Sequence, residues 1–163
     1  MIPKPFDEVA KKDIDDLVAE GRAERRTLEY KQTLPNLAME QDKYEFLADV
    51  ASLANAAGGD ILFGVVEKRD ADKKPTGIAE SAPGVAIGNA DAIIRPLEQS
   101  ARSIIDPKVP GLQMRPHRRF PVRPRGPRPR PEKLRRAAHG QERQELGTVL
   151  RAGQHRQAPT GRG

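Results

Sequence analysis

The amino-acid sequence predicts a small α+β protein in which a mixed sheet packs against helices. Residues 41–57 repeat apolar side chains at helical spacing from Phe46 to Leu53, with charged side chains on the other side. Gly58–Gly59 then ends this helix and turns the chain. Residues 61–66 form a continuous apolar run, which is typical of a strand buried on both faces.

Shorter elements surround this helix and strand. Asp13 is placed to cap a short helix over residues 14–18, and Gly21 is a plausible stop for it. Residues 27–31 alternate apolar and polar side chains, which favours a half-buried strand. Residues 68–76 are a charged, hairpin-like loop, and a return strand is expected directly after it.

A third helix is expected over residues 89–105. Its apolar side runs from Ile93 to Ile104, and Pro96 either kinks the helix or marks its first turn. Residues 109–114 look like the opening of a further strand. After Met114 the pattern stops, so we expect the closing strands of the sheet to be missing.

The charge divides the chain into two compositions. Residues 1–114 hold 15 Lys and Arg against 20 Asp and Glu, a net charge of −5. Residues 115–163 hold 14 Lys and Arg against 3 acids, a net charge of +11. We therefore divide the chain into a helical lead-in (1–19), a domain (20–114) and a basic Arg/Pro-rich tail (115–163). The tail has too few large apolar side chains to order itself.

Composition also excludes several classes of protein. The chain has no Cys, which excludes disulfides, thiolate catalysis and Cys-based zinc sites. The three His lie far apart in the tail without ligand spacing. No apolar run approaches the roughly 18 residues that span a bilayer, and no signal peptide is evident, so a cytoplasmic protein is expected.

Four blocks of residues together resemble the Schlafen-type AlbA-like domain family, which is common in bacterial regulators. In chain order they are Glu24 with Leu28–Lys31, Phe46–Gly59, Ile61–Val65 and Ile104–Gly111. The resemblance covers about residues 20–114. It implies a compact α+β fold and a DNA-binding module of transcriptional regulators, and members were also catalogued as divergent AAA-type ATP-binding proteins.

The resemblance also implies a set of candidate acids, because some Schlafens cleave RNA with clustered carboxylates. Glu24 and Glu29 match the paired glutamates of the family, and Glu67 is a rough candidate for a third. Converging carboxylates can hold Mg²⁺ or Mn²⁺ against a phosphodiester. On an extended segment Glu24 and Glu29 would project to opposite faces, so convergence needs a turn between them. The alternative is that both are solvated surface acids.

Lys31, Asn55, Gly58 and Gly59 are the candidate contacts with nucleic acid or nucleotide. A glycine pair lets backbone amides approach a phosphate. However, a phosphate cradle usually runs from strand through Gly-rich loop to helix, and the order here is reversed. A simple helix stop is therefore favoured for Gly58–Gly59, and a helix-end cap is favoured for Asn55.

The basic tail has two interpretations. Its alternating Arg and Pro could form an extended arm along a phosphate backbone. Alternatively it is a reading-frame error of a GC-rich gene. With synonymous codons read one nucleotide later, Pro127–Pro131 becomes V-L-V-P-R and Glu132–Gly140 becomes R-S-S-G-A-P-H-T-V. Leu146–Arg162 becomes S-A-R-F-Y-A-R-G-N-I-G-K-H-R-L-D-V. These resemble the closing blocks of the family, in order, so we hypothesise a frameshift shortly after Met114.

The sequence thus predicts a nucleic-acid-binding regulatory module without catalysis of its own. The first alternative is a metal-dependent ribonuclease that uses Glu24, Glu29 and Glu67. The second alternative is an ATP-binding transcriptional regulator.

Overall fold

A computed structural model describes residues 1–56, 58–118 and 145–152, and the structural statements below concern these residues. Three α-helices, one 3₁₀-helix and two sheets are formed. The elements are η1 (Phe6–Glu8), α1 (Lys11–Ala19), β1 (Leu28–Lys31), α2 (Glu40–Asn55), β2 (Gly59–Phe63), β3 (Val66–Arg69), β4 (Pro75–Ser81), β5 (Val85–Ala86), α3 (Ala90–Ile104), β6 (Gln113–Arg118) and β7 (Glu145–Ala152). The predicted α+β class with a mixed sheet is confirmed.

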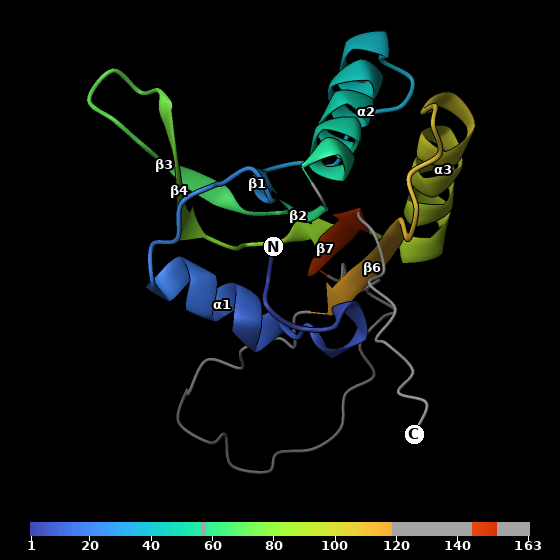
Figure 1. The fold of residues 1–163 in the computed structure, drawn as a ribbon. Helices are drawn as coiled ribbons and strands as arrows, with labels where there is room; N and C mark the ends of the chain where they lie inside the picture. The colour runs from blue at the N-terminus through green and yellow to red at the C-terminus, as the bar shows by residue number, and fades with distance from the viewer. Residues whose placement is uncertain (57, 119–144, 153–163) are drawn as a thin grey trace, which may run out of the picture.

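The main sheet is mixed. β1 and β2 run parallel, whereas β7 pairs antiparallel with β2, β5 and β6. Because Thr148–Arg151 is paired with β2 and with β6, β7 lies between these two strands. β3 and β4 form a separate two-stranded hairpin, which projects from the body of the molecule (Figure 1).

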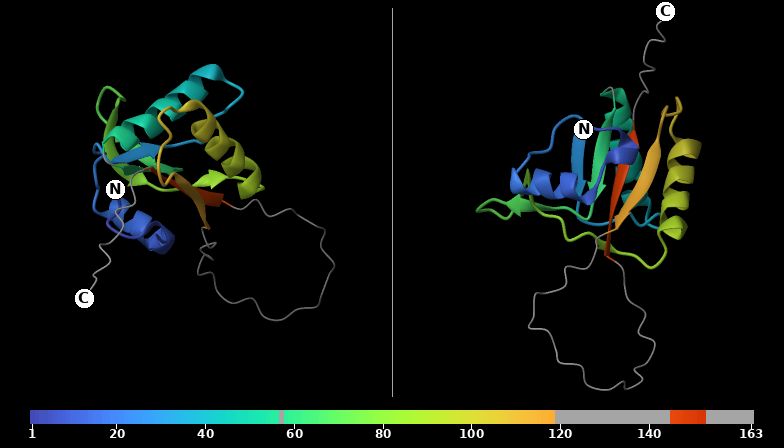
Figure 2. Two further views of the ribbon diagram at one scale, coloured as in Figure 1. Left: turned by 45° about the vertical axis from the view of Figure 1, so that its right-hand side comes forward. Right: turned by 90° about the horizontal axis from the view of Figure 1, so that it is seen from below.

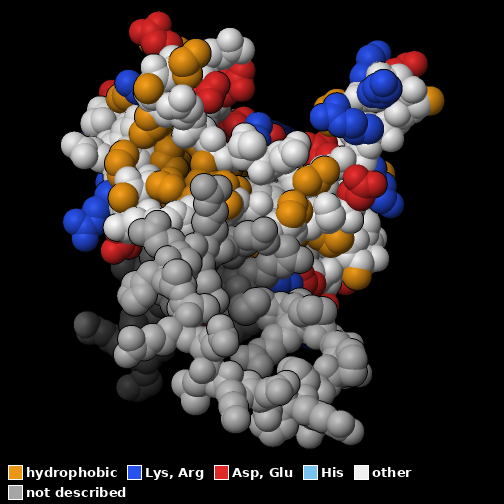
Figure 3. Space-filling view, turned by 180° about the vertical axis from the view of Figure 1, so that it is seen from behind, with side chains coloured by type: hydrophobic (Ala, Val, Ile, Leu, Met, Phe, Trp, Pro, Cys, Tyr) orange, Lys and Arg blue, Asp and Glu red, His pale blue; other side chains and the backbone are white. Residues whose placement is uncertain are grey.

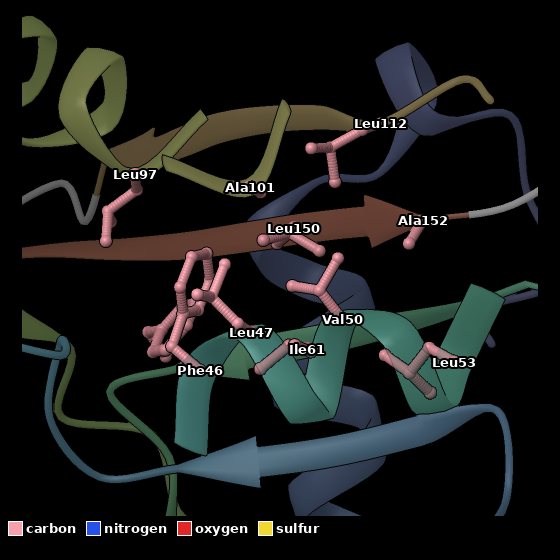
Figure 4. Close-up of a cluster of buried hydrophobic side chains, with 11 residues drawn as sticks. Phe46, Leu47, Val50, Leu53, Ile61, Leu97, Ala101, Leu112, Leu150 and Ala152 are labelled. Atoms are coloured by element: carbon pink, nitrogen blue, oxygen red, sulfur yellow. The ribbon is translucent and has the colours of Figure 1, made fainter. Parts of the chain in front are cut away.

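Helices cover both faces of this sheet. α2 and α3 lie on one face, and α1 with the N-terminal segment lies on the other (Figure 2). Alternation along the strands divides the core accordingly: Ile61 and Leu150 pack under α2 and α3, whereas Leu62 and Val149 pack against α1. Figure 4 shows α2 side chains directed at Leu150 and Ile61. The sheet is therefore the middle layer between two apolar clusters.

The predicted helices form close to their expected ends. α1 begins at Lys11, earlier than predicted, so Asp13 lies in its first turn and is not the residue before it; there its carboxylate accepts a hydrogen bond from the Ala10 N–H (2.8 Å). Gly21 follows the helix with a φ of 58°. α3 begins after Asn89, whose side chain accepts from the Ala92 N–H, and it includes Pro96 in its interior rather than in its first turn. Ile104 was expected on the buried side and is 47% exposed instead.

The apolar run 61–66 is not one strand, which corrects the sequence prediction. β2 ends at Phe63 and β3 begins at Val66. Gly64 between them has a φ of 84°, and a Cβ there would lie 2.5 Å from the Gly84 Cα. The close approach of these two glycines lets the chain leave the main sheet and enter the hairpin.

The expectation that the sheet lacks its closing strands is also wrong. β6 continues four residues past Met114, and β7 comes from the basic tail that was expected to be disordered. Val149, Leu150 and Ala152 are fully buried in this strand. Their apolar surface is enough to hold an eight-residue strand in the sheet, even though the composition of the tail as a whole is unfavourable. The rest of the tail lies outside the described residues.

A buried ion pair ties the N-terminal segment to β2 and β7. Asp60 is fully buried, and its carboxylate accepts hydrogen bonds from the Arg151 guanidinium (Nε–Oδ1, 2.6 Å) and from the Ile2 N–H. Arg151 also donates to the Lys4 and Ile2 carbonyl oxygens, and it lies 5.6 Å from the centre of the Phe6 ring. Every oxygen of this buried carboxylate therefore has a partner.

Candidate functional site

A turn brings Glu24 and Glu29 to the same side of the molecule. Arg25 and Leu28 exchange backbone hydrogen bonds of 3.0 and 2.9 Å, so the chain reverses between the two glutamates. Both glutamates then line one open hollow of about 310 Å³, together with Asp49 of α2. The turn that convergence of the two acids requires is therefore present.

Glu24 is held by the backbone of β1. Its Oε1 accepts a hydrogen bond of 2.7 Å from the Tyr30 N–H. Burial raises the pKa of Glu24 above its ordinary value, the bond from Tyr30 opposes this change, and the negative charges of Glu29 and Glu67 add to it. Glu24 thus accepts a hydrogen bond that holds β1 and lies near two other carboxylates.

Glu67 lies in β3 and does not line the hollow. Its Oε2 accepts a hydrogen bond of 2.8 Å from the Gly77 N–H of β4. The structure therefore brings Glu24 and Glu29 to one hollow, whereas the carboxylate of the third candidate acid, Glu67, is hydrogen-bonded to β4 within the hairpin.

Lys31 links β1 to α2 through two ion pairs. Its Nζ lies 3.0 Å from Glu29 Oε1 and 2.9 Å from Asp49 Oδ2. Burial lowers the pKa of Lys31, but the hydrogen bonds to Asp49 and Glu29 outweigh this effect and raise the pKa above its ordinary value. The Lys31 ammonium is thus charged at neutral pH and compensates both carboxylates. Sequence reasoning placed Asp49 on the solvated side of the helix and missed this pairing.

The candidate acids do not form a complete metal site by themselves. Within residues 1–56, 58–118 and 145–152, no group of three or more His, Asp or Glu side chains could hold a metal ion. Mg²⁺ is often bound by one or two carboxylates and completed by water and substrate phosphates. A metal at Glu24 and Glu29 would need such additional ligands.

Gly58 and Gly59 serve the geometry of the chain. Gly58 has a φ of 97°, and its N–H donates to the Leu53 carbonyl oxygen (2.9 Å). A Cβ on Gly59 would lie 2.6 Å from a Leu53 methyl carbon and 2.8 Å from the Thr27 carbonyl oxygen. Both positions are therefore accounted for by the helix stop and by close packing.

Asn55 is the last residue of α2 and is exposed. The residue at the C-cap position is Ala56, whose N–H donates to the Ser52 and Leu53 carbonyl oxygens. The helix-end cap expected at Asn55 is therefore one residue further along the chain.

The β3–β4 hairpin gathers cationic side chains that sequence reasoning did not single out. Lys68, Arg69, Lys73 and Lys74 are all exposed around its tip. Asp70 Oδ1 accepts from the Asp72 and Lys74 N–H groups (2.9 and 2.8 Å), so this carboxylate shapes the turn. Figure 3 shows Lys and Arg side chains along the projecting arm at its upper right. The sequence run K-R-D-A-D-K-K was the available signal.

One comparison with known proteins supports the family resemblance found in the sequence. The family model described as Schlafen, AlbA_2 matches residues 24–124, which is more than half of the chain and includes the hollow and the hairpin. Neither the curated proteins nor the solved structures give a match to this chain. Among the described helices, none is long and apolar enough to cross a membrane.

Proposed function

Because this chain belongs to the Schlafen AlbA_2 family, we propose that it is a nucleic-acid-binding module without catalysis of its own. The observation that carries this proposal is the β3–β4 hairpin, which projects from the body of the molecule and exposes four cationic side chains beside two aspartates around its tip (Lys68, Arg69, Lys73, Lys74; Asp70, Asp72). A two-stranded ribbon fits the major groove of B-form DNA, and lysines at its tip can pair with the phosphates of either DNA or RNA.

The test is a salt titration of binding to a labelled DNA or RNA duplex. The slope of log K against log salt is negative, and each phosphate contact that is lost should reduce its magnitude by about 1. The double variant Lys73→Gln/Lys74→Gln should therefore weaken binding and flatten the slope by about 2. The matched control, Arg128→Gln/Arg130→Gln, removes the same charge from the tail. An equal effect of both variants would contradict a specific role for the hairpin.

A metal-dependent ribonuclease is the second candidate, because Glu24, Glu29 and Asp49 line the same hollow. Mg²⁺- or Mn²⁺-dependent cleavage of RNA, abolished by Glu29→Gln, would favour it over the binding module. The bond from Tyr30 to Glu24 and the ion pair of Glu29 with Lys31 favour a structural role for both acids.

The ATP-binding alternative has less support. The Gly58 N–H already donates to Leu53, so it does not offer a free amide for a phosphate. Saturable binding of ATP by the intact chain would revive this alternative.

A further inference from the structure

The base of the hairpin is attached to the segment that precedes β1. The Glu24 N–H donates to the Gly77 carbonyl oxygen (2.6 Å), and the Ala79 N–H donates to the Arg22 carbonyl oxygen (3.3 Å). Ala23 and Ile78 form an antiparallel bridge between these two bonds. The direction in which the hairpin leaves the body of the molecule is therefore set at Gly77 and its neighbours.

The ladder of the hairpin is irregular at this point. Glu67 pairs with Ala79, but Arg69 pairs with Pro75 instead of the Gly77 that a regular antiparallel ladder would give. Two of the three β4 residues from Thr76 to Ile78 are thus extra, because together they lie opposite Lys68 alone. Such a bulge bends a strand and increases its local twist, so it redirects the tip.

One carboxylate, that of Glu67, bonds to this bulge, and a second, that of Glu24, packs against it; we call these two residues with Gly77 the Gly77 clamp (Glu24, Glu67 and Gly77). The Glu67 carboxylate accepts the Gly77 N–H (2.8 Å) that has left the ladder. On the other side Gly77, with a φ of 71°, packs so closely on Glu24 that a Cβ would lie 3.3 Å from Glu24 Oε2. Glu24 is itself fixed by the Tyr30 N–H.

We propose that Glu24 and Glu67 are positioning residues that fix the direction of the β3–β4 hairpin for nucleic-acid binding. This inference rests on the proposed function. The two acids act through hydrogen bonds that their oxygens accept, and the exposed lysines at the tip make the contact with phosphate. Two of the three candidate acids of the family resemblance, Glu24 and Glu67, thereby help to fix the direction of the hairpin.

Because the carboxylate of Glu67 acts as a hydrogen-bond acceptor, two substitutions can separate the loss of its charge from the loss of its acceptor oxygen. Glutamine keeps an oxygen that can accept the Gly77 N–H, whereas alanine removes it. Glu67→Gln should therefore bind a duplex within about twofold of the unchanged chain, and Glu67→Ala should lose about tenfold, the effect of one hydrogen bond to a charged group. The same comparison applies to Glu24→Gln and Glu24→Ala.

Two controls separate positioning from charge and from folding. Glu80→Ala removes one negative charge from an exposed position on β4 and should leave binding unchanged or slightly stronger. Thermal unfolding and amide exchange are measured on every variant. In Glu67→Ala, exchange of the Gly77 amide should accelerate about tenfold while the melting temperature stays close to that of Glu80→Ala.

The outcomes distinguish the two proposals. If the unchanged chain binds no duplex, the proposed function fails, and exchange at Gly77 still decides whether the clamp exists. The positioning role is overturned if Glu67→Ala leaves both exchange and binding unchanged. It is equally overturned if Glu67→Gln is as damaging as Glu67→Ala, because the charge and not the acceptor would then be required. Gly77→Ala tests the clamp independently and should weaken binding without any change of charge.

Discussion

The neighbouring strands β2 and β7 differ in how their buried polar side chains are accommodated. In β2, the Asp60 carboxylate has hydrogen-bond partners on both oxygens. In β7, Thr148 is 1% exposed, and its hydroxyl has no partner within the described chain. A buried group left unpaired costs about 1–3 kcal/mol. The buried polar side chain of β2, from the acidic part of the sequence, is therefore fully hydrogen-bonded, whereas that of β7, from the basic tail, is not.

The strand beside β7 shows the same feature. The Nε2 atom of His117 in β6 is buried without a partner, and it lines the same narrow space as Thr148. In the described residues one other buried side-chain atom lacks a partner, the Ser100 hydroxyl of α3. Two arginines of these strands are well paired, Arg115 of β6 with the Asp7 carbonyl oxygen and Arg151 of β7 with Asp60, and apolar side chains such as Leu150 supply the buried contacts. This pattern is compatible with a frameshifted tail.

The largest effect is expected from breaking the buried side-chain ion pair between the two strands, Asp60 with Arg151. Asp60→Ala leaves the Arg151 guanidinium half-buried without its carboxylate, and loss of one partner from a buried pair costs about 3–5 kcal/mol. Urea unfolding followed by circular dichroism measures the change. Asp16→Ala is the control, because its pair with Lys12 is solvent-exposed and should contribute little to stability. Equal effects of the two variants would contradict the buried link.

A matched pair of core truncations compares the strands directly. Ile61 of β2 and Leu150 of β7 are paired in register, and both are fully buried. Ile61→Ala and Leu150→Ala should each lower the free energy of unfolding by about 2–5 kcal/mol, through lost burial and a cavity. If Leu150→Ala has no effect while Ile61→Ala does, β7 does not occupy the sheet in solution.

Much of the fold could be predicted from local signals. The amphipathic stripe of α2, the alternation of β1 and the charged hairpin each depend on residues that are near in sequence. The turn that brings Glu24 and Glu29 together was recognised as a requirement for their convergence. Local pattern did not reveal that the run 61–66 divides, because that depends on Gly84 approaching Gly64 from a distant segment.

Each feature that the sequence did not predict depends on residues that are distant in the chain or on local averaging of composition. The composition of residues 115–163 is dominated by Arg and Pro, so it does not reveal the short apolar segment that forms β7. Asp49 has an outward position on α2, and its partner Lys31 comes from another element. The role of Glu67 depends on a bulge in β4, which spacing along the chain does not encode.

A third prediction concerns the reading frame. We expect the gene, read one nucleotide later, to encode R-F-Y-A-R at positions 148–152, so that restoring the frame includes Thr148→Arg and Arg151→Ala. The expected gain of stability is about 1 kcal/mol from removing the unpaired Thr148 hydroxyl, and it requires that another restored residue replaces Arg151 as the partner of the buried Asp60. Sequencing of the gene and urea unfolding of both chains are the measurements. Codons that do not read in this way refute the frameshift.

The smallest effect is expected from protonation of His117, and it follows from the same unpaired site. Burial lowers the pKa of His117 below its ordinary value of 6.5, the charge of Arg115 lowers it further, and Asp13 opposes this shift. The folded state therefore favours neutral His117. Its contribution to stability is fully present above about pH 6.5 and is lost as the pH falls from there through the folded pKa.

The contribution of His117 is isolated by comparing the unchanged chain with the variant His117→Gln. Glu24, whose raised pKa acts in the opposite direction, titrates in both chains. The free energy of unfolding of the unchanged chain, measured from pH 8 to pH 5, should therefore decrease relative to that of His117→Gln. Parallel curves would mean that His117 is as well solvated in the folded chain as in the unfolded one. In that case β6 and β7 would not enclose it, and the contrast with β2 would no longer hold.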